Sequence, residues 1–372
     1  MLNLVEKTRK TLERLVKNLK TQESVSSVSL FGSQSRGDAV ISSDVDLMIV
    51  DSREFDYEYV ERVEQNGVLI DLNYIPRKWI TRTVPPEIDQ KIFEAYVLYD
   101  RDWTLSNVKE QITKSYYTPE RLGIRADIYL IDADIFLSRA TSAQAREDYE
   151  STKVFATMSA QSILKTLVEA CKLPLSNSRY VETLKKAAEQ LNTPWHFASY
   201  QTVAGLDSLS QDAVEERLSG FKAIWDEIAT SVRVNKPFMD TLHFKIRTKL
   251  DYYVAPAFLQ GMILRSQALL NEGALQEAAH YVFSVLVDML ENYAWLRAYQ
   301  QNVRLDYSTL FRSLKGLTQK PSSIHKNAII ALGLADLDAN NVEKIVALAR
   351  QIVLDIRGRR KTLFNTRKQE TY

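Results

Sequence analysis

The chain has 372 residues and a formal net charge of +1, with 48 lysine and arginine residues against 47 aspartate and glutamate residues. This balance excludes a global positive field that would recruit nucleic acid or an anionic membrane. The single cysteine excludes an intramolecular disulfide. With only four histidines beside it, a zinc centre built from His and Cys is also not expected. No run of about 18 apolar residues exists, so we expect no membrane span. The charged N-terminus lacks the apolar core of a signal peptide, and we interpret the protein as cytoplasmic.

The first hundred residues predict a mixture of helices and strands. Leucines at helical spacing predict an amphipathic helix over residues 2–20, and the segment 54–65 is compatible with a second helix. Alternating or apolar runs predict strands over residues 25–31, 45–50, 68–75 and 95–100. We take residues 1–105 as one α+β domain.

From about residue 106 glycine and proline become rare, and helical patterns follow one another. The candidate helices span residues 120–139, 143–171, 178–191, 211–233, 238–270, 273–300 and 340–356. The pattern predicts an all-α, bundle-like region in two domains, residues 106–235 and 236–372. The second domain ends in a basic tail, residues 357–372, which we interpret as a solvated segment in preference to a nucleic-acid contact.

Two aspartates lie within the apolar run of VSLFGSQSRGDAVISSDVDLMIV, residues 28–50. If residues 45–50 form a strand, the side chains of Asp44 and Asp46 point to the same face. Carboxylates this close repel each other, and a divalent cation removes that conflict. Carboxylate oxygens are hard ligands, so the pair predicts a site for Mg²⁺.

Asp71 lies in the middle of another apolar run, GVLIDLNYI, where a charge is costly unless it is paired or binds a metal. If the two strands are neighbours, Asp71 completes a cluster with Asp44 and Asp46. Such a cluster can hold two metal ions, one to activate an attacking hydroxyl and one to hold the triphosphate and the leaving group.

Gly32 and Ser33 end the first predicted strand and begin a turn or short helix. Glycine allows the backbone to approach a phosphate, the Ser33 hydroxyl can donate to it, and Arg36 adds a positive charge suited to phosphate oxygens. A phosphate-binding turn followed by metal-binding carboxylates predicts nucleotidyl transfer from a nucleoside triphosphate. The alternative is that these residues have structural roles only. Gly32 would then form a plain turn, Asp44 would cap a helix or turn, and Asp71 would be an edge-strand residue whose carboxylate is hydrogen-bonded.

The stretch LFGSQSRGDAVISSDVDLMIV resembles the signature of the DNA polymerase β-like nucleotidyltransferase superfamily. It looks most like the bacterial branch of minimal and aminoglycoside, or kanamycin-type, nucleotidyltransferases. The resemblance covers about residues 24–75 and extends to about residue 100. It implies a small mixed sheet flanked by helices.

The resemblance also implies roles for individual residues. Ser33 would contact the triphosphate, and Asp44, Asp46 and Asp71 would bind Mg²⁺. Kanamycin-type enzymes likewise follow the catalytic domain with a helical one, in which an acidic residue acts as general base on the acceptor hydroxyl. The equivalent here is Asp134, although the family has a glutamate at that point.

Glu147 is the alternative general base. The chain is about 130 residues longer than a small antibiotic nucleotidyltransferase. This extra length departs from the family pattern and counts against an antibiotic as the acceptor.

We therefore expect an enzyme that moves a nucleoside monophosphate, AMP from ATP above all, to a hydroxyl of a small acceptor such as an aminoglycoside-like compound, with release of pyrophosphate. RNA or a partner protein is the alternative acceptor, and a nucleotide-binding protein without turnover is the third hypothesis. The resemblance also allows a homodimer.

Overall fold

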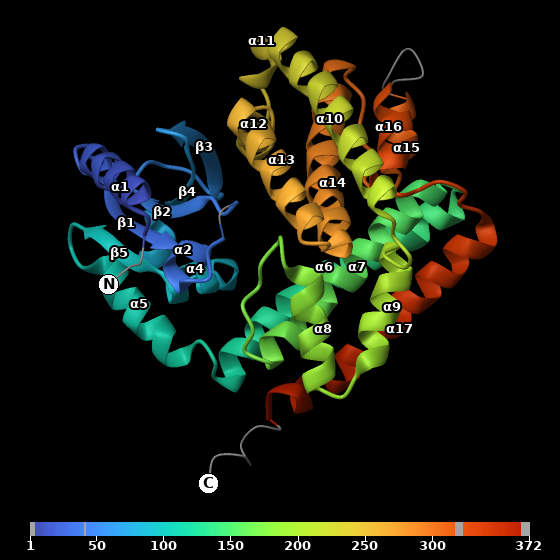
Figure 1. The fold of residues 1–372 in the computed structure, drawn as a ribbon, viewed down its shortest axis with the longest axis horizontal. Helices are drawn as coiled ribbons and strands as arrows, with labels where there is room; N and C mark the ends of the chain where they lie inside the picture. The colour runs from blue at the N-terminus through green and yellow to red at the C-terminus, as the bar shows by residue number, and fades with distance from the viewer. Residues whose placement is uncertain (1–3, 41, 317–322, 366–372) are drawn as a thin grey trace. The chain divides into compact units, whose positions relative to one another are not determined.

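The computed structural model describes residues 4–40, 42–316 and 323–365 (Figure 1). They form two compact units, of which the first draws on Met1–Tyr117 and His243–Arg265 and the second on Thr118–Leu242 and Ser266–Tyr372. The division into three domains at residues 105 and 235 stays a prediction.

A five-stranded mixed sheet forms the centre of the first unit (Figure 1). The strands are β1 (Val25–Phe31), β2 (Val45–Asp51), β3 (Tyr59–Gln65), β4 (Val68–Pro76) and β5 (Tyr96–Asp100). They lie in the order β3-β4-β2-β1-β5, in which β2 and β4 are parallel and the other neighbours are antiparallel. The expected α+β fold of this part is confirmed.

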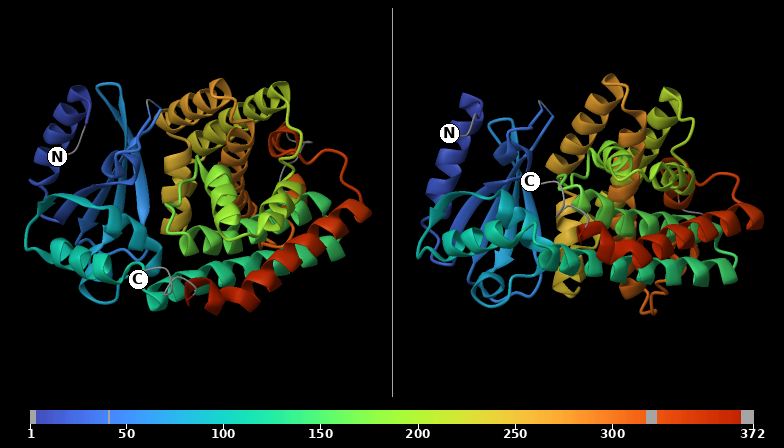
Figure 2. Two further views of the ribbon diagram at one scale, coloured as in Figure 1. Left: turned by 60° about the horizontal axis from the view of Figure 1, so that its bottom comes forward. Right: turned by 90° about the horizontal axis from the view of Figure 1, so that it is seen from below.

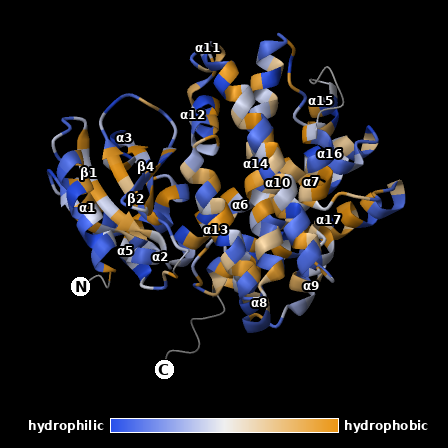
Figure 3. Cartoon of the chain, turned by 45° about the horizontal axis from the view of Figure 1, so that its top comes forward, coloured by the Kyte–Doolittle hydropathy of each residue, from blue (hydrophilic) through white to orange (hydrophobic). Residues whose placement is uncertain are grey.

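Helices cover both faces of this sheet (Figure 3), which explains why every residue of β1 is buried and why β2 is a nearly continuous apolar run. On one face, Leu12 and Val16 of α1 pack against residues of β1, β2 and β4. On the other face, Ile92 of α4 and Leu105 of α5 pack with Met48. The helices of this unit are α1 (Glu6–Leu19), α2 (Gly32–Arg36), α3 (Arg77–Thr81), α4 (Asp89–Glu94), α5 (Thr104–Ser115), α12 (Phe244–Tyr253) and the first part of α13 (Pro256–Asn271); a 3₁₀ turn, η1, spans Pro86–Ile88.

The helix considered for residues 54–65 is wrong, because Tyr59–Gln65 form strand β3. Asn66 and Gly67, with φ 54° and 65°, make the two-residue turn of a hairpin between β3 and β4. An Asn-Gly pair favours this turn because both residues tolerate positive φ. Pairing with β4 therefore outweighs the local helical tendency of this glutamate-containing segment.

The regular elements of the second unit are all helices within the described ranges. They are α6 (Pro119–Ala145), α7 (Tyr149–Ala170), α8 (Tyr180–Gln190), α9 (Pro194–Ala204), α10 (Gln211–Val234), α11 (Lys236–Met239), the end of α13, α14 (Leu275–Gln300), α15 (Leu310–Gly316), α16 (Ser323–Leu332) and α17 (Ala339–Asn365). Helix α17, red in Figure 2, packs along α6 and α7. The expected helical region is confirmed, and none of the described helices combines the length and apolarity that a membrane span requires.

Several helix boundaries differ from those expected. The single helix predicted over residues 238–270 is three helices, and Pro256 begins the last of them. The interruption expected over 191–211 contains α9, which begins at Pro194. Proline is tolerated in the first turn because the N–H that it lacks has no helical partner there. Residues 366–372 of the predicted basic tail lie outside the described residues.

Candidate active site

The end of β1 carries the residues expected to bind phosphate. Gly32 begins α2 directly after Phe31, and Phe31 pairs across the sheet with Asp46. Gly32 has φ +71°, and a Cβ atom there would lie 2.5 Å from Oδ2 of Asp46. This close approach requires glycine, and it places the phosphate-binding turn directly against a carboxylate.

The three carboxylates predicted to cluster are brought together by the sheet. Asp46 on β2 and Asp71 on β4 are register partners on parallel neighbouring strands. Asp44 directly precedes β2, and its side chain is 11% exposed. The expected juxtaposition therefore follows from the pairing of β2 with β4.

Two arginines neutralise this cluster. Arg62 lies opposite Asp71 in the register of β3 and β4, and it donates from Nε and Nη2 to Oδ1 and Oδ2 of Asp71 at 2.5 Å each. The same Nη2 donates to Oδ2 of Asp44 at 2.5 Å. Arg265 of α13 donates to Oδ1 of Asp44 at 2.6 Å. All four carboxylate oxygens of Asp44 and Asp71 thus accept from guanidinium groups.

Helices α12 and α13 pack around Arg62. The Tyr252 hydroxyl donates to Oδ2 of Asp71 at 3.3 Å. The ring centroids of Tyr252 and Phe258 lie 5.5 and 5.8 Å from Cζ of Arg62. A Cβ atom at Gly261 would lie 2.6 Å from Nη1 of Arg62, so this glycine leaves room for the guanidinium group.

The carboxyl groups differ in their affinity for protons. Burial raises the pKa of Asp46 well above its ordinary value, and the charges of Asp44 and Asp71 raise it further. Burial also opposes ionisation of Asp44, but Arg265 and Arg62 outweigh this effect and hold the pKa of Asp44 below its ordinary value. Of these two neighbours, Asp46 retains its proton more strongly.

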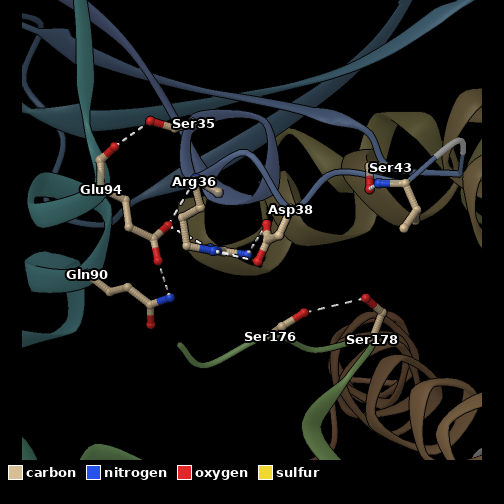
Figure 4. A network of polar contacts seen from close by, with 10 residues as sticks. Ser35, Arg36, Asp38, Ser43, Gln90, Glu94, Ser176 and Ser178 are labelled. Carbon is tan, nitrogen blue, oxygen red and sulfur yellow. Dashed lines mark hydrogen bonds and ion pairs between the residues drawn. The ribbon is translucent and has the colours of Figure 1, made fainter. Parts of the chain in front are cut away.

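The expected phosphate-binding groups also have partners within the chain (Figure 4). Arg36 forms ion pairs with Glu94 at 2.9 Å and with Asp38 at 3.1 Å. Oε2 of Glu94 also accepts from the backbone N–H of Gly32 at 3.0 Å, while its Oε1 accepts from Gln90 at 2.7 Å. A carboxylate therefore lies at the N–H and guanidinium groups that a phosphate would use.

Ser33 is partly buried in the first turn of α2, and its carbonyl oxygen accepts from the N–H of Gly37 at 2.9 Å. Asp134 lies on α6 in the second unit, where it is half exposed and forms an ion pair with Arg357. Glu147, the alternative, is exposed between α6 and α7. The assignment of either residue as general base stays a prediction.

No sequence pattern described above predicts the positions of Arg62, Glu94 and Arg265. The Asn66-Gly67 turn contains the signal that places Arg62 opposite Asp71, because a two-residue hairpin fixes the register of its strands. No comparable local signal exists for Arg265, which is 221 residues from Asp44 in the chain.

Among the described residues, no group of three or more His, Cys, Asp or Glu side chains is arranged to hold a metal ion. The residue types at this edge of the sheet nevertheless fit a hard divalent cation, because three carboxylates supply oxygen ligands. The obstacle is the orientation of Asp44 and Asp71 toward Arg62 and Arg265. The donor set fits Mg²⁺ in its chemistry, and a cation at Asp44 would compete with Arg265 for that carboxylate.

Residues 13–103 match a family model described as "Polymerase beta, Nucleotidyltransferase". A comparison with curated proteins gives no match. A nucleotidyltransferase-like protein from Exiguobacterium sibiricum 255-15 is similar at 13% identity and a TM-score of 0.33, over 75% of this chain and 79% of that chain, and we draw no conclusion from this likeness. The family match supports a polymerase β-like nucleotidyltransferase domain in the first unit and nucleotidyl transfer as its class of chemistry.

Proposed function

We propose that this chain transfers a nucleoside monophosphate, AMP from ATP, to a hydroxyl of a small polar acceptor such as an aminoglycoside-like compound, and that pyrophosphate is released. The observation that carries this proposal is the sheet register that sets Asp46 beside Asp71, with Gly32 in contact with Asp46. A phosphate-binding turn and adjacent carboxylates are the two parts that such a transfer needs.

In this proposal the triphosphate binds at the start of α2. The backbone N–H of Gly32 and the Ser33 hydroxyl donate to phosphate oxygens, and Arg36 supplies a positive charge. Asp44, Asp46 and Asp71 would hold two Mg²⁺ ions. These ions would stabilise the negative charge of the phosphate oxygens and of the leaving pyrophosphate.

The remaining role is proton removal from the acceptor. Asp134, with Glu147 as the alternative, would accept the proton of the acceptor hydroxyl as general base. Both residues lie in the second unit.

One observation favours a second candidate, a nucleotide-binding protein without turnover. The ion pairs of Arg62 and Arg265 satisfy Asp44 and Asp71 without any metal. Such a protein would bind ATP and release no pyrophosphate.

Transfer of label from α-phosphate-labelled ATP, with Mg²⁺, tests both candidates. Pools of aminocyclitol-type small molecules, total tRNA and cell protein are offered as acceptors. We expect label in the small-molecule pool, loss of it in Asp46→Asn, and wild-type transfer in the control Asp56→Asn, whose side chain is 75% exposed. Label in RNA or protein would show that the acceptor is a macromolecule and not a small molecule. ATP binding without label in any pool would favour the second candidate.

A further inference from the structure

The chain's own side chains fill both halves of the candidate site. We propose that these contacts are autoinhibitory: Arg265 takes the position of a cation at Asp44, and Glu94 takes the position of a phosphate at Gly32 and Arg36. The inference rests on the proposed function, because it describes how the same site is regulated. Binding of a divalent cation with a nucleoside triphosphate then requires that both side chains move away.

We call the carboxylates of Asp44, Asp46 and Asp71 the cation half of the site, and Gly32 and Arg36 the anion half. The two arginines at the cation half, Arg62 and Arg265, differ in how firmly they are held. Arg62 has a side chain only 4% exposed, makes two hydrogen bonds to Asp71 and fits against Gly261. Arg265 is 17% exposed and reaches Asp44 from helix α13. Departure of Arg62 would break a buried, bidentate ion pair and leave Asp71 without its cation, whereas solvent already reaches Arg265, so Arg265 is the group that moves.

The anion half is closed in the same way. The Glu94 side chain is 6% exposed, and one of its oxygens, Oε2, accepts from both Gly32 N–H and the Arg36 guanidinium. Those two donors are among the groups proposed to bind the triphosphate. A phosphate and the Glu94 carboxylate compete for the same hydrogen bonds, and two anions this close repel each other.

Arg265 lies in the part of α13 that belongs to the first unit. It is the last residue of the returning segment His243–Arg265, and α13 continues past it to Asn271. A rotation or shift of this helix would withdraw Arg265 from Asp44. Loss of that one ion pair would leave Asp44 with the contact to Arg62 and an oxygen available to a cation.

Manganese binding measures the cation half directly. Free Mn²⁺ is titrated by electron paramagnetic resonance against wild type, Arg265→Gln and the control Arg82→Gln, which removes an equal charge from an exposed position. We expect about tenfold tighter Mn²⁺ binding in Arg265→Gln, the size of one charge-assisted hydrogen bond, and no change in Arg82→Gln. Circular dichroism verifies that each variant is folded.

The possible results separate this proposal from the proposed function. Mn²⁺ binding in wild type that is equal or weaker in Arg265→Gln overturns the autoinhibitory contact and leaves the metal site intact. Absence of Mn²⁺ binding from all three proteins, with and without α,β-methylene-ATP, overturns the metal site and with it both proposals.

A measurement on the wild-type chain needs no substitution. Hydrogen–deuterium exchange is followed before and after addition of MnCl₂ and α,β-methylene-ATP. Release of Arg265 predicts faster amide exchange in residues 256–265 on binding. Unchanged or slower exchange there, at concentrations where the analogue is bound, would contradict a movement of α13 that withdraws Arg265.

The anion half is tested with Glu94→Gln and the exposed control Glu87→Gln. Binding of α,β-methylene-ATP is measured in EDTA, so that metal binding makes no contribution. We expect several-fold tighter binding in Glu94→Gln alone, because the competing carboxylate is gone. Equal affinity in wild type and Glu94→Gln would remove Glu94 from the proposal.

Discussion

Gly32 and Gly37 share a left-handed backbone conformation but differ in what a side chain would meet. Both have φ between 70° and 85°, while a Cβ would contact Asp46 at Gly32 and nothing within 4 Å at Gly37. We expect Gly37→Ala to lower the free energy of unfolding by about 1–2 kcal/mol through backbone strain alone. Gly32→Ala should cost at least about 1 kcal/mol more, because Asp46 must also shift.

Urea denaturation with circular dichroism measures both values, and calorimetric titration with α,β-methylene-ATP measures the effect on the site. Nucleotide binding should be lost in Gly32→Ala and kept in Gly37→Ala. Equal losses of stability and equal binding would show that the contact between Gly32 and Asp46 has no consequence.

The positions of individual carboxylates could be predicted from the sequence, because alternation along a strand is a local property. Asp44, Asp46 and Asp71 stand out in apolar runs, and strand pairing brings them together. The partners of those carboxylates could not be predicted in this way. Arg265 reaches Asp44 by a packing arrangement that no local pattern records.

At the scale of helices, α6 and α7 are joined by a buried ion pair. Arg125 donates from Nε and Nη2 to the two oxygens of Glu169 at 2.9 and 2.8 Å, and both side chains are under 5% exposed. Tyr129 also donates to Glu169 at 3.0 Å. We expect Arg125→Met to destabilise the second unit by about 3–5 kcal/mol, because it leaves a buried carboxylate without its cation.

The double variant Arg125→Met/Glu169→Leu tests the cause. Because both charges are gone, thermal denaturation should show it within about 1.5 kcal/mol of wild type. If the double variant loses as much stability as the single one, the loss comes from packing and not from the unpaired Glu169.

Element types were predictable where the pattern was long or the apolar run unbroken, as for β2 and the long helices α10 and α14. Strand β3 was not, because residues 54–65 have neither a clear strand alternation nor an apolar run, and β4 decides their conformation by pairing. The Asn66-Gly67 turn was the overlooked local signal.

Across the whole molecule, one buried carboxyl predicts a pH dependence of stability. Glu277 on α14 accepts from the backbone N–H groups of Val181 and Glu182 at the start of α8, at 3.2 and 2.6 Å. Burial nevertheless raises the pKa of Glu277 to about 7. Arg179 and Glu182 act on it in opposite directions, the first lowering and the second raising its pKa.

The sign follows from the two states. Below the ordinary pKa of a glutamate, Glu277 is protonated both folded and unfolded, so it has no effect on the pH dependence. As pH rises from about 4.5 to about 7, only the unfolded chain loses this proton, and stability falls by up to about 3 kcal/mol before it levels off. We expect Glu277→Gln to remove this fall.

Urea denaturation of wild type and variant between pH 4.5 and 8 measures the difference. The exposed Glu189→Gln on α8 is the control and should keep the wild-type slope. If wild type and Glu277→Gln have parallel pH profiles, Glu277 titrates in the folded protein as it does in the unfolded chain.

The whole-molecule organisation was predictable only as far as a sheet-containing part followed by helices. The return of residues 243–265 to the first unit was not, because it depends on packing between segments far apart in the chain. Tyr252 and Arg265 enter the site by this return, so the chemistry of the carboxylates depends on residues outside the stretch that resembles a nucleotidyltransferase.

Anomalous diffraction from crystals of the full chain, grown with MnCl₂ and α,β-methylene-ATP, would locate the cation and the nucleotide in the candidate site. We predict an anomalous peak within ligand distance of the carboxylates of Asp44, Asp46 and Asp71. We also predict the triphosphate at Gly32 and Ser33, and Arg265 withdrawn from Asp44. A bound nucleotide with no manganese peak at these carboxylates, or with the peak elsewhere, would contradict these predictions.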